Sequence, residues 1–309
     1  MFAIPDGDIL KQGQQQLDRM MQAKKPAGPH QERIDVFNDT KAWIRSDTAL
    51  SEAVLNAQLK TSLFYENDYP AFQRPERDQR ITVTKHRSYE AAMLLHKQNP
   101  GAKIAVMNFA NAFNPGGGVT TGASAQEECL CRCSTLYPVL NTPTLQERFY
   151  QYHKDLNTAK ASDSIVYSEG IIICKTDTDL PQRMPEEDWV SVDVMTIAAP
   201  DLRTNSNQHV ALVGNGTFMN NAELFGCHVK RAIHLLTVAA AKGADCLVLG
   251  AFGCGAFKND PHVVARAYKV ALQEFPKVFR EIEFAIYCGA MASPNYVAFH
   301  DELIGEEET

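Results

Sequence analysis

The chain has 309 residues, of which 45% are hydrophobic and 22% charged, and its formal net charge at pH 7 is −7. This composition is that of a globular protein and excludes the collagen-like, disordered and membrane-spanning classes. The acidic balance also disfavours a broad nucleic-acid-binding surface, because neutralising phosphates requires clustered Lys and Arg side chains. We therefore expect any polyanionic ligand to be held locally, by backbone N–H groups.

The cysteine content and the first residues indicate an intracellular protein. A chain of this length and apolar fraction does not depend on disulfide bonds, so we expect its 8 cysteines to be reduced. Residues 1–16 carry Asp6 and Asp8 where a signal peptide needs an apolar stretch, and no apolar run approaches the roughly 20 residues of a membrane helix. We expect a cytoplasmic monomer without a membrane partner, or a nuclear one if the source is eukaryotic.

The chain divides into two regions of different pattern. Residues 1–79 are polar and show helical spacing around 48–64 without clear strands, which predicts a helical N-terminal extension. From Arg80 onward, short β-branched runs alternate with amphipathic helical stretches, which is the pattern of βα units. Residues 80–309 are thus predicted to form one α/β domain, and the sequence leaves the role of residues 1–79 open.

The second region predicts a three-layer α/β/α sandwich around a mixed, largely parallel sheet. Most of its expected strands are apolar throughout, as strands covered on both faces should be. They span residues 81–84, 103–108, 170–174, 192–198, 246–250 and 283–288. Helices are expected at 88–98, capped by Ser88, and at 222–242, closed by Gly243 in the left-handed position after the last turn.

Consecutive glycines mark the first candidate site. Gly116, Gly117 and Gly118 follow the predicted strand at 103–108. Glycine lets the backbone turn sharply and approach a ligand closely, so we expect this loop to wrap a substrate at the C-terminal edge of the sheet. A plain tight turn is the alternative interpretation.

Two adjacent glutamates follow the glycines. Ser124, with Glu127 three residues later, has the pattern of a capping box and predicts the start of a helix. Glu128 lies one position further, and successive helical residues point about 100° apart, so the two carboxylates cannot face one atom identically. We predict a divided role: one carboxyl group transfers a proton to a leaving oxygen, and the other accepts hydrogen bonds from ligand hydroxyls or caps the helix.

A second glycine-rich turn follows the predicted strand at 246–250. It reads GAFGCGAFKNDP from Gly250 to Pro261, and Asp260 with Pro261 supplies a cap and a first helical residue. A strand, a glycine loop and a helix start in this order can hold phosphate on backbone N–H groups. We expect an anionic small molecule here, with a structural turn as the alternative.

The sequence gives little support to other chemistries. Neither glycine loop completes the G-x-G-x-x-G fingerprint, because Thr121 and Lys258 occupy the last positions, and no G-x-x-x-x-G-K-[ST] segment is present. Cys129 and Cys133 share a helix face while Cys131 points away, so we expect no three-ligand metal cage. The prediction is therefore of neither a metal nor a cofactor.

These residues resemble the macrodomain-type poly(ADP-ribose) glycohydrolases, specifically the microbial branch. The signature of that family is three glycines, a short spacer and Gln-Glu-Glu, and here 116–118 is followed after seven residues by Gln126, Glu127 and Glu128. The resemblance covers most of residues 80 to 300. It extends through 108–115, 193–200, 253–255, 284–287 and 295–296. A helical region ahead of the macrodomain is similar to microbial members as well.

The resemblance implies a macrodomain-like catalytic domain at 80–309, a glycosidase that hydrolyses the ribose–ribose O-glycosidic bonds of poly(ADP-ribose) from chain ends and releases ADP-ribose. It implies that Glu128 is the general acid and base and that Glu127 contacts ribose hydroxyls. The ribose-binding residues that it implies are Asn108, Asn114, Gly116, Gly117, Gly118 and Gln126. Those implied for the diphosphate are Gly253, Cys254, Gly255, Ala256 and Phe257, the last also packing on the ribose.

Two alternatives would use the same pocket. One is removal of single ADP-ribose units from proteins or nucleic acid, and the other is a macrodomain that binds ADP-ribose without cleaving. A binding module does not need paired glutamates at a helix start, so Glu127 and Glu128 favour catalysis. The expected partners are poly(ADP-ribose) or ADP-ribosylated protein, with ADP-ribose as the product.

Overall fold

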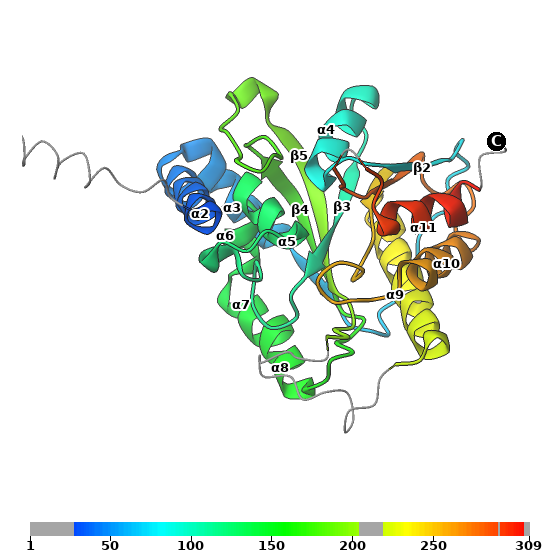
Figure 1. Cartoon of the computed structure of the whole chain (residues 1–309). Coiled ribbons are helices and arrows are strands. Elements are labelled where there is room, and N and C mark those ends of the chain that lie inside the picture. Colours follow the sequence, from blue (N-terminus) through cyan, green and yellow to red (C-terminus); the bar gives the residue numbers. More distant parts are fainter. Residues whose placement is uncertain (1–27, 204–218, 290, 306–309) are drawn as a thin grey trace, which may run out of the picture.

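The computed structural model describes residues 28–203, 219–289 and 291–305, and its centre is a seven-stranded mixed sheet (Figure 1). The strand order is β1-β4-β5-β3-β6-β7-β2. β5, β3, β6, β7 and β2 pair in parallel, whereas β4 is antiparallel to both β1 and β5. The strands are β1 (Ser62–Phe64), β2 (Arg80–Thr84), β3 (Ile104–Ala110), β4 (Ile165–Ile173), β5 (Val190–Ala198), β6 (Cys246–Leu249) and β7 (Glu281–Ala285).

Helices cover both faces of the sheet, which confirms the three-layer sandwich. The long helices are α2 (Pro29–Ser46), α3 (Thr48–Lys60), α4 (Ser88–Gln98), α5 (Gln126–Cys133), α9 (Asn221–Ala241), α10 (Pro261–Leu272) and α11 (Pro294–Leu303). Shorter ones are η1 (Val119–Thr121), α6 (Leu136–Leu140), α7 (Pro143–Leu145), the π-helix η2 (Gln146–Gln151), α8 (Tyr152–Leu156) and η3 (Glu186–Asp188). Helices α2 to α6 pack with Val106 and Val194 on one face, whereas α9, α10 and α11 pack with Met107 and Met195 on the other.

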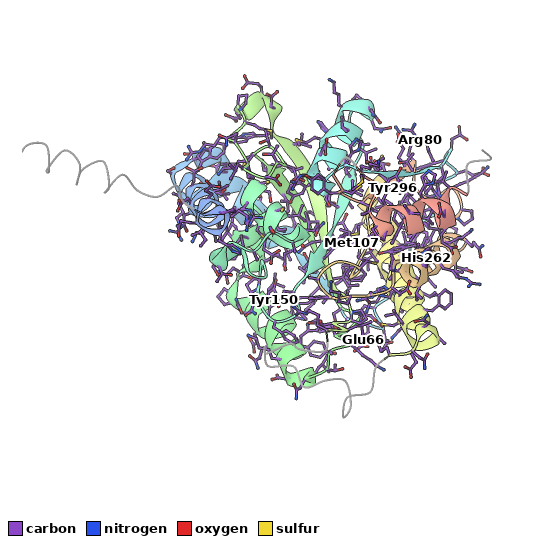
Figure 2. The ribbon with its side chains drawn as sticks, in the orientation of Figure 1. Glu66, Arg80, Met107, Tyr150, His262 and Tyr296 are labelled. Carbon is purple, nitrogen blue, oxygen red and sulfur yellow. The ribbon has the colours of Figure 1, made fainter. Side chains whose placement is uncertain are left out.

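Apolar side chains fill the space between the layers (Figure 2). Met107 lies in the middle of the molecule and Tyr150 is buried, whereas Arg80 and His262 lie at the surface. Because successive strand residues point to opposite faces, one apolar strand supplies both cores. Within the part of the chain that the structure describes, no helix is long and apolar enough to span a bilayer.

All six predicted strands are present with shifted ends, and β4 differs most. It begins at Ile165 rather than at the predicted Gly170, and its pairing with β5 shifts register between Ser168 and Ile171. Gly170 has a φ of +76°, a left-handed conformation that accompanies such a bulge. The polar residues around the bulge interrupt the apolar run, so the predicted start was wrong.

The N-terminal region contains helices, as predicted, and also a strand that was not predicted. β1 pairs with β4 and forms one edge of the sheet, so the expectation of no strand before Arg80 was wrong. A strand of three residues is too short to leave a periodic signal in the sequence. Residues 1–27 of the predicted extension lie outside the described residues, and the boundary between 79 and 80 stays a prediction.

Helix ends follow capping chemistry, with one correction. α9 starts after Asn220, whose side chain accepts the Glu223 N–H, and Gly243 adopts a φ of +74° beyond its end, as predicted. Ser88 is the first residue of α4 rather than its cap, because the N-cap is Arg87. The Glu90 carboxylate accepts the Arg87 N–H at 3.0 Å, so the cap lies one residue earlier than expected.

The topology brings both predicted loops to one edge of the sheet. β3 runs into the glycine loop that precedes α5, and β6 runs into the turn that precedes α10. β3 and β6 are parallel neighbours, so the segments that follow them leave the sheet at its carboxyl edge. Ligands of parallel α/β sheets bind at this edge.

Candidate active site

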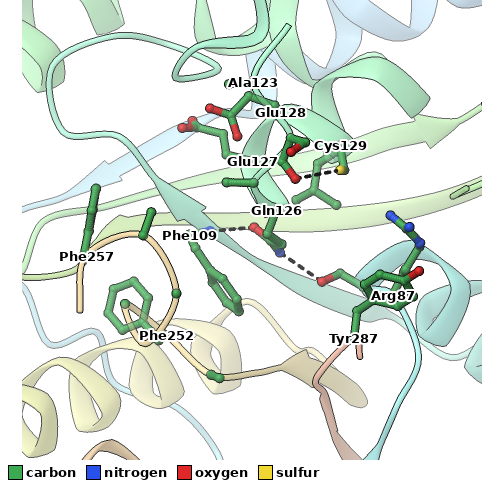
Figure 3. Close-up of a pocket in the computed structure, with 18 of the residues that line it drawn as sticks. Arg87, Phe109, Ala123, Gln126, Glu127, Glu128, Cys129, Phe252, Phe257 and Tyr287 are labelled. Atoms are coloured by element: carbon green, nitrogen blue, oxygen red, sulfur yellow. Dashed lines mark hydrogen bonds between the residues drawn. The ribbon is translucent and has the colours of Figure 1, made fainter. Parts of the chain in front are cut away.

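A cavity of about 600 Å³ lies at the carboxyl edge of the sheet. It is walled by the glycine loop and the first turn of α5, by the turn after β6, and by the segments that follow β2 and β7 (Figure 3). Pockets of this size bind small molecules. The two loops that the sequence singled out therefore border a single cavity.

Gln126 fastens the first turn of α5 to the sheet. Its Oε1 accepts the Phe109 N–H at 2.9 Å, and its Nε2 donates to Ser88 Oγ at 3.0 Å (Figure 3). The same Nε2 donates to Met107 O at 2.7 Å. The amide lines the cavity, but both of its donors and its acceptor have protein partners. Gln126 thus fixes the helix that carries the two glutamates.

The predicted capping box is not formed. α5 follows Ala125, which has no side chain that could cap it, and Ser124 is not the N-cap. Glu127 instead turns its carboxylate toward the glycine loop. Backbone N–H groups of that loop lie outside any helix or strand and need acceptors. They donate to the Glu127 carboxylate, which in a capping box would have accepted the N–H of the cap residue.

The Glu127 side chain links α5 to the glycine loop through hydrogen bonds. It is 2% exposed, and its oxygens accept the Asn111 N–H at 2.7 Å, the Gly116 N–H at 3.2 Å and the Asn108 amide at 3.4 Å. Burial raises the pKa of Glu127 to about 8, the Asn111 N–H opposes this rise, and the nearby Glu128 adds to it. The Glu127 carboxyl group therefore binds a proton more tightly than a free glutamate does.

Glu128 differs from Glu127 in its hydrogen bonds. It lines the cavity and is 7% exposed, and its Oε1 accepts the Gly118 N–H at 2.8 Å. Its Oε2 is buried and has no hydrogen-bond partner within residues 28–203, 219–289 and 291–305. An oriented carboxyl group with one oxygen uncommitted is able to give or take a proton.

Gly117 covers both carboxyl groups. With a φ of +56°, it places its Cα where an added Cβ would lie 2.5 Å from Glu128 Oε1 and 3.1 Å from Glu127 Oε2. Real Cβ atoms do not approach oxygen so closely, so a side chain here would displace the carboxylates. The glycine is required by close approach as well as by backbone conformation.

The turn after β6 presents free backbone donors to the cavity. Asp260 caps α10 by accepting the N–H groups of His262 and Val263, so these two N–H groups are already engaged. Four turn N–H groups have no hydrogen-bond partner in the described part of the chain: those of Gly253, Gly255, Ala256 and Phe257. Successive free N–H groups form anion-binding concavities, so the turn suits a diphosphate.

Comparison with known proteins identifies the family. A family described as "Microbial-type PARG, catalytic domain" matches residues 31–176. A solved poly(ADP-ribose) glycohydrolase from Deinococcus radiodurans, in complex with ADP-ribose, is 30% identical with a TM-score of 0.68, and the match covers 81% of this chain and 97% of that one. This chain belongs to the microbial-type poly(ADP-ribose) glycohydrolase (PARG) family. The PARG of Thermomonospora curvata is 28% identical with a TM-score of 0.74, covering 88% of this chain and 99% of that one. No curated protein matches the chain.

Eight of the residues implied by the PARG resemblance line the cavity. They are Gly118, Gln126, Glu127, Glu128, Gly253, Gly255, Ala256 and Phe257. The other five are adjacent and do not line it: Asn108, Asn114, Gly116, Gly117 and Cys254. Asn108 and Gly116 donate to Glu127, and the Asn114 carbonyl accepts the Gly117 N–H at 3.0 Å, so these residues hold the loop. The roles in ligand binding stay predictions.

Cys254 lies behind the turn rather than in the PARG cavity wall. Burial raises the pKa of its thiol, its N–H donates to Ala251 O at 3.1 Å, and its Sγ lies 3.6 Å from Phe252 O. A buried protonated thiol without a base partner does not serve as a nucleophile. Its contribution is to the packing of the turn.

Three cavity residues at the far end of the pocket were missed by the sequence analysis. His86 and Arg87 follow β2, and Tyr287 follows β7. The Arg87 guanidinium stands 3.8 Å from the centre of the Tyr287 ring, and His86 Nδ1 lies 2.8 Å from the Glu283 carboxylate. The rule that ligands bind beyond the carboxyl ends of parallel strands would have found them.

The sequence analysis also missed Arg203, which lines the cavity together with the turn after β6. It pairs with Asp201 and lies 5.1 Å from the centre of the Phe257 ring. The Leu202 N–H donates to Phe257 O at 2.9 Å. The segment after β5 therefore supports the position of Phe257.

Proposed function

We propose that the protein hydrolyses the ribose–ribose O-glycosidic bonds of poly(ADP-ribose) and releases ADP-ribose from chain ends. The observation that carries the proposal is the contrast between the two glutamates: Glu127 is committed to three N–H donors, whereas Glu128 has one donor and a second oxygen without a partner in the described residues. Both lie in a cavity that also carries free backbone N–H groups. The family to which the chain belongs supports this substrate class.

Glu128 is the general acid and base in this mechanism. The oxygens of Glu127 accept three N–H groups, whereas Oε2 of Glu128 has no partner in the described residues, so we assign the transferred proton to Glu128. Glu128 gives it to the leaving ribose oxygen as an oxocarbenium-like transition state develops, and then removes a proton from the attacking water. The water oxygen bonds to the anomeric carbon, and the leaving chain keeps the hydroxyl.

Glu127 has a supporting role. Each carboxylate oxygen has lone pairs to spare after the bonds it accepts, so Glu127 can also accept a hydrogen bond from a ribose hydroxyl. Its bonds to Asn111 and Gly116 hold the glycine loop over the ribose. The N–H groups of the turn at 253–257 bind the diphosphate at the other end of the cavity.

The cavity volume supports action at chain ends. A space of about 600 Å³ suits one small-molecule-sized unit rather than an internal stretch of polymer. A terminal ADP-ribose therefore enters, and only one glycosidic bond reaches Glu128 at a time. An enzyme cutting inside the chain would need an opening at both ends of the site.

Product analysis tests the substrate and the direction of attack. Automodified poly(ADP-ribosyl)ated protein should yield free ADP-ribose from the first time point, without short oligomers. Early oligomers would contradict the chain-end mechanism. Release from mono-ADP-ribosylated protein alone would establish the mono-ADP-ribosyl hydrolase, and tight ADP-ribose binding without turnover on either substrate would establish a binding module.

We also propose that the enzyme works inside the cell as a monomer with reduced thiols. All eight cysteines are free in the structure, which supports a reducing environment. Cell fractionation and size-exclusion chromatography with light scattering test this proposal. Recovery from a secreted fraction, or the mass of a dimer, would contradict it.

A further inference from the structure

The last turn of the glycine loop, 118–123, is a compact hydrogen-bonded unit. The Gly118 carbonyl accepts the N–H groups of Thr121 at 3.0 Å and Ala123 at 3.1 Å and the Thr121 hydroxyl at 2.9 Å, while Gly122 donates to Val119 O at 3.3 Å. The Gly118 N–H at the start of this unit donates to Glu128. A shift of the turn therefore moves the donor that orients Glu128.

Helix α2 of the N-terminal region packs directly on this turn. Gly122 has a φ of +77°, and a Cβ there would lie 2.3 Å from the His30 carbonyl oxygen and 3.0 Å from its Cα. The two backbones touch, and only glycine permits this approach. The Arg33 Nε donates to Gly122 O at 2.6 Å across the same contact.

A second guanidinium also holds the turn, through the next carbonyl along the chain. Arg132, in the last turn of α5 and 2% exposed, donates from Nη1 to Ala123 O at 2.7 Å. Its own backbone carbonyl accepts the hydroxyl of Thr40, which is on α2, at 2.7 Å. Helix α2 thus contacts both ends of the segment 122–132, which contains Glu128.

We propose that Arg33 is a positioning residue for Glu128 and that α2 belongs to the catalytic unit. The proposal rests on the proposed role of Glu128 as the acid and base. Arg33 holds Gly122, the turn 118–122 transmits that position to the Gly118 N–H, and this N–H orients the Glu128 carboxyl group. The N-terminal region would then support catalysis without contacting substrate.

Three variants of Arg33 separate the hydrogen bond from the charge. Glutamine carries an amide nitrogen at the same place along the side chain as Arg Nε, so Arg33→Gln keeps a donor and loses the charge. Arg33→Lys keeps the charge and places its donor one atom further out, and Arg33→Ala removes both. Arg45→Ala, at an exposed position in the last turn of α2, is the matched control.

Steady-state release of ADP-ribose from poly(ADP-ribose), ADP-ribose binding by calorimetry and thermal unfolding are measured for the full-length wild type and each variant. Loss of positioning by a fraction of an ångström to one ångström costs up to about 100-fold in rate, so we expect kcat of Arg33→Ala to fall between about 10- and 100-fold. KM and the ADP-ribose Kd should stay within about twofold, and Arg33→Gln should recover most of kcat. Arg45→Ala should match the wild type.

The possible outcomes distinguish failure of the proposed function from failure of the positioning role of Arg33. Wild type that releases no ADP-ribose overturns the proposed function itself. Active wild type with an unchanged kcat in Arg33→Ala overturns the positioning role, and so does a lower melting temperature with unchanged kcat, which would show a purely structural contact. Recovery by Arg33→Lys but not by Arg33→Gln would overturn the hydrogen-bond account in favour of charge.

Discussion

The backbone N–H of Gly118 donates to Oε1 of Glu128 over 2.8 Å, so the main chain of the glycine loop sets the position of one oxygen of this carboxyl group. A backbone donor cannot be altered by substitution at its own position without changing the loop. The neighbouring glycines and their contacts therefore provide the sharpest tests of the site.

Gly117→Ala should abolish most activity in a folded protein. The new Cβ would lie 2.5 Å from Glu128 Oε1, and the φ of +56° adds about 1 kcal/mol of strain. We expect kcat to fall at least about 100-fold as the carboxyl group is displaced. Gly101→Ala is the control, because Gly101 has a φ of +80° and no described atom lies within 4 Å of its added Cβ. Equal activity losses in the two variants would contradict the steric account.

Stability should fall with rising pH because of the Glu127 carboxyl group. Its pKa is raised from 4.5 to about 8, so the folded state binds a proton more tightly than the unfolded state between these values. This contribution is complete below about pH 4.5 and is lost as the pH rises through about 8. Glu127→Gln removes the group. We therefore expect the melting temperature of Glu127→Gln minus that of the wild type to become more positive between pH 5 and pH 8.5, whatever this difference is at pH 5. A constant or decreasing difference would contradict the raised pKa.

Asn259→Ala should weaken ADP-ribose binding by loosening the turn at 253–257, whose N–H groups we propose to bind the diphosphate. The Asn259 amide is buried and donates to Pro200 O at 2.7 Å and to Gly253 O at 3.1 Å. We expect Kd to rise about 10-fold, equivalent to about 1.4 kcal/mol. Asn99→Ala is the control, since the Asn99 amide is buried and donates to Leu95 O at 3.2 Å away from the cavity. Calorimetry that finds the same Kd for both variants and the wild type would rule out this role.

Asp39→Asn tests how firmly α2 is attached to the rest of the domain. Asp39 lies 2.7 Å from the Lys175 ammonium, whose side chain is 2% exposed, and the Arg183 guanidinium together with Lys175 lowers the pKa of Asp39 to about 2. Removing the charge leaves Lys175 buried and poorly paired. Because Asp39 is itself 44% exposed, we expect a loss of only about 1–2 kcal/mol in the free energy of unfolding.

The double variant Asp39→Asn with Lys175→Met is the control for that prediction. Replacing a buried charge by an apolar side chain of similar length removes the desolvation cost. Denaturant unfolding should therefore show part of the lost stability recovered. A double variant less stable than Asp39→Asn would mean that Lys175 is held by its bond to Val36 O, 3.2 Å away, rather than by the ion pair.

The parts of the fold that sequence predicts are those with a strong local signal. β3 and β6 are largely apolar runs, and the loops after them contain Gly117 and Gly253, whose positive φ and close neighbours leave no room for a side chain. β1 left no signal because it has three residues, and the bulge at Gly170 hid the first half of β4. Long-range pairing, rather than local propensity, determines both of these elements.

The candidate site also has features that the local sequence predicts and features that depend on long-range contacts. Helical geometry alone predicts that Glu127 and Glu128 have different roles. It does not predict their hydrogen-bond donors, because the sequence pattern at Ser124 indicates a capping box. In the structure, N–H groups of a loop some ten residues away in the sequence donate to the two carboxyl groups instead. Arg33 carries no motif and lies 89 residues from Gly122 in the sequence. Contacts of this kind appear only when the chain is folded.

Glu128→Gln is the decisive test of Glu128 as the acid and base. Release of ADP-ribose from automodified poly(ADP-ribosyl)ated protein should fall at least about 100-fold, the magnitude of general acid–base catalysis, while calorimetry shows ADP-ribose bound within about threefold of the wild-type Kd. The amide keeps the Gly118 N–H partner and cannot give a proton of suitable acidity. Release within a few fold of wild type, with binding intact, would rule out Glu128 as the acid and base.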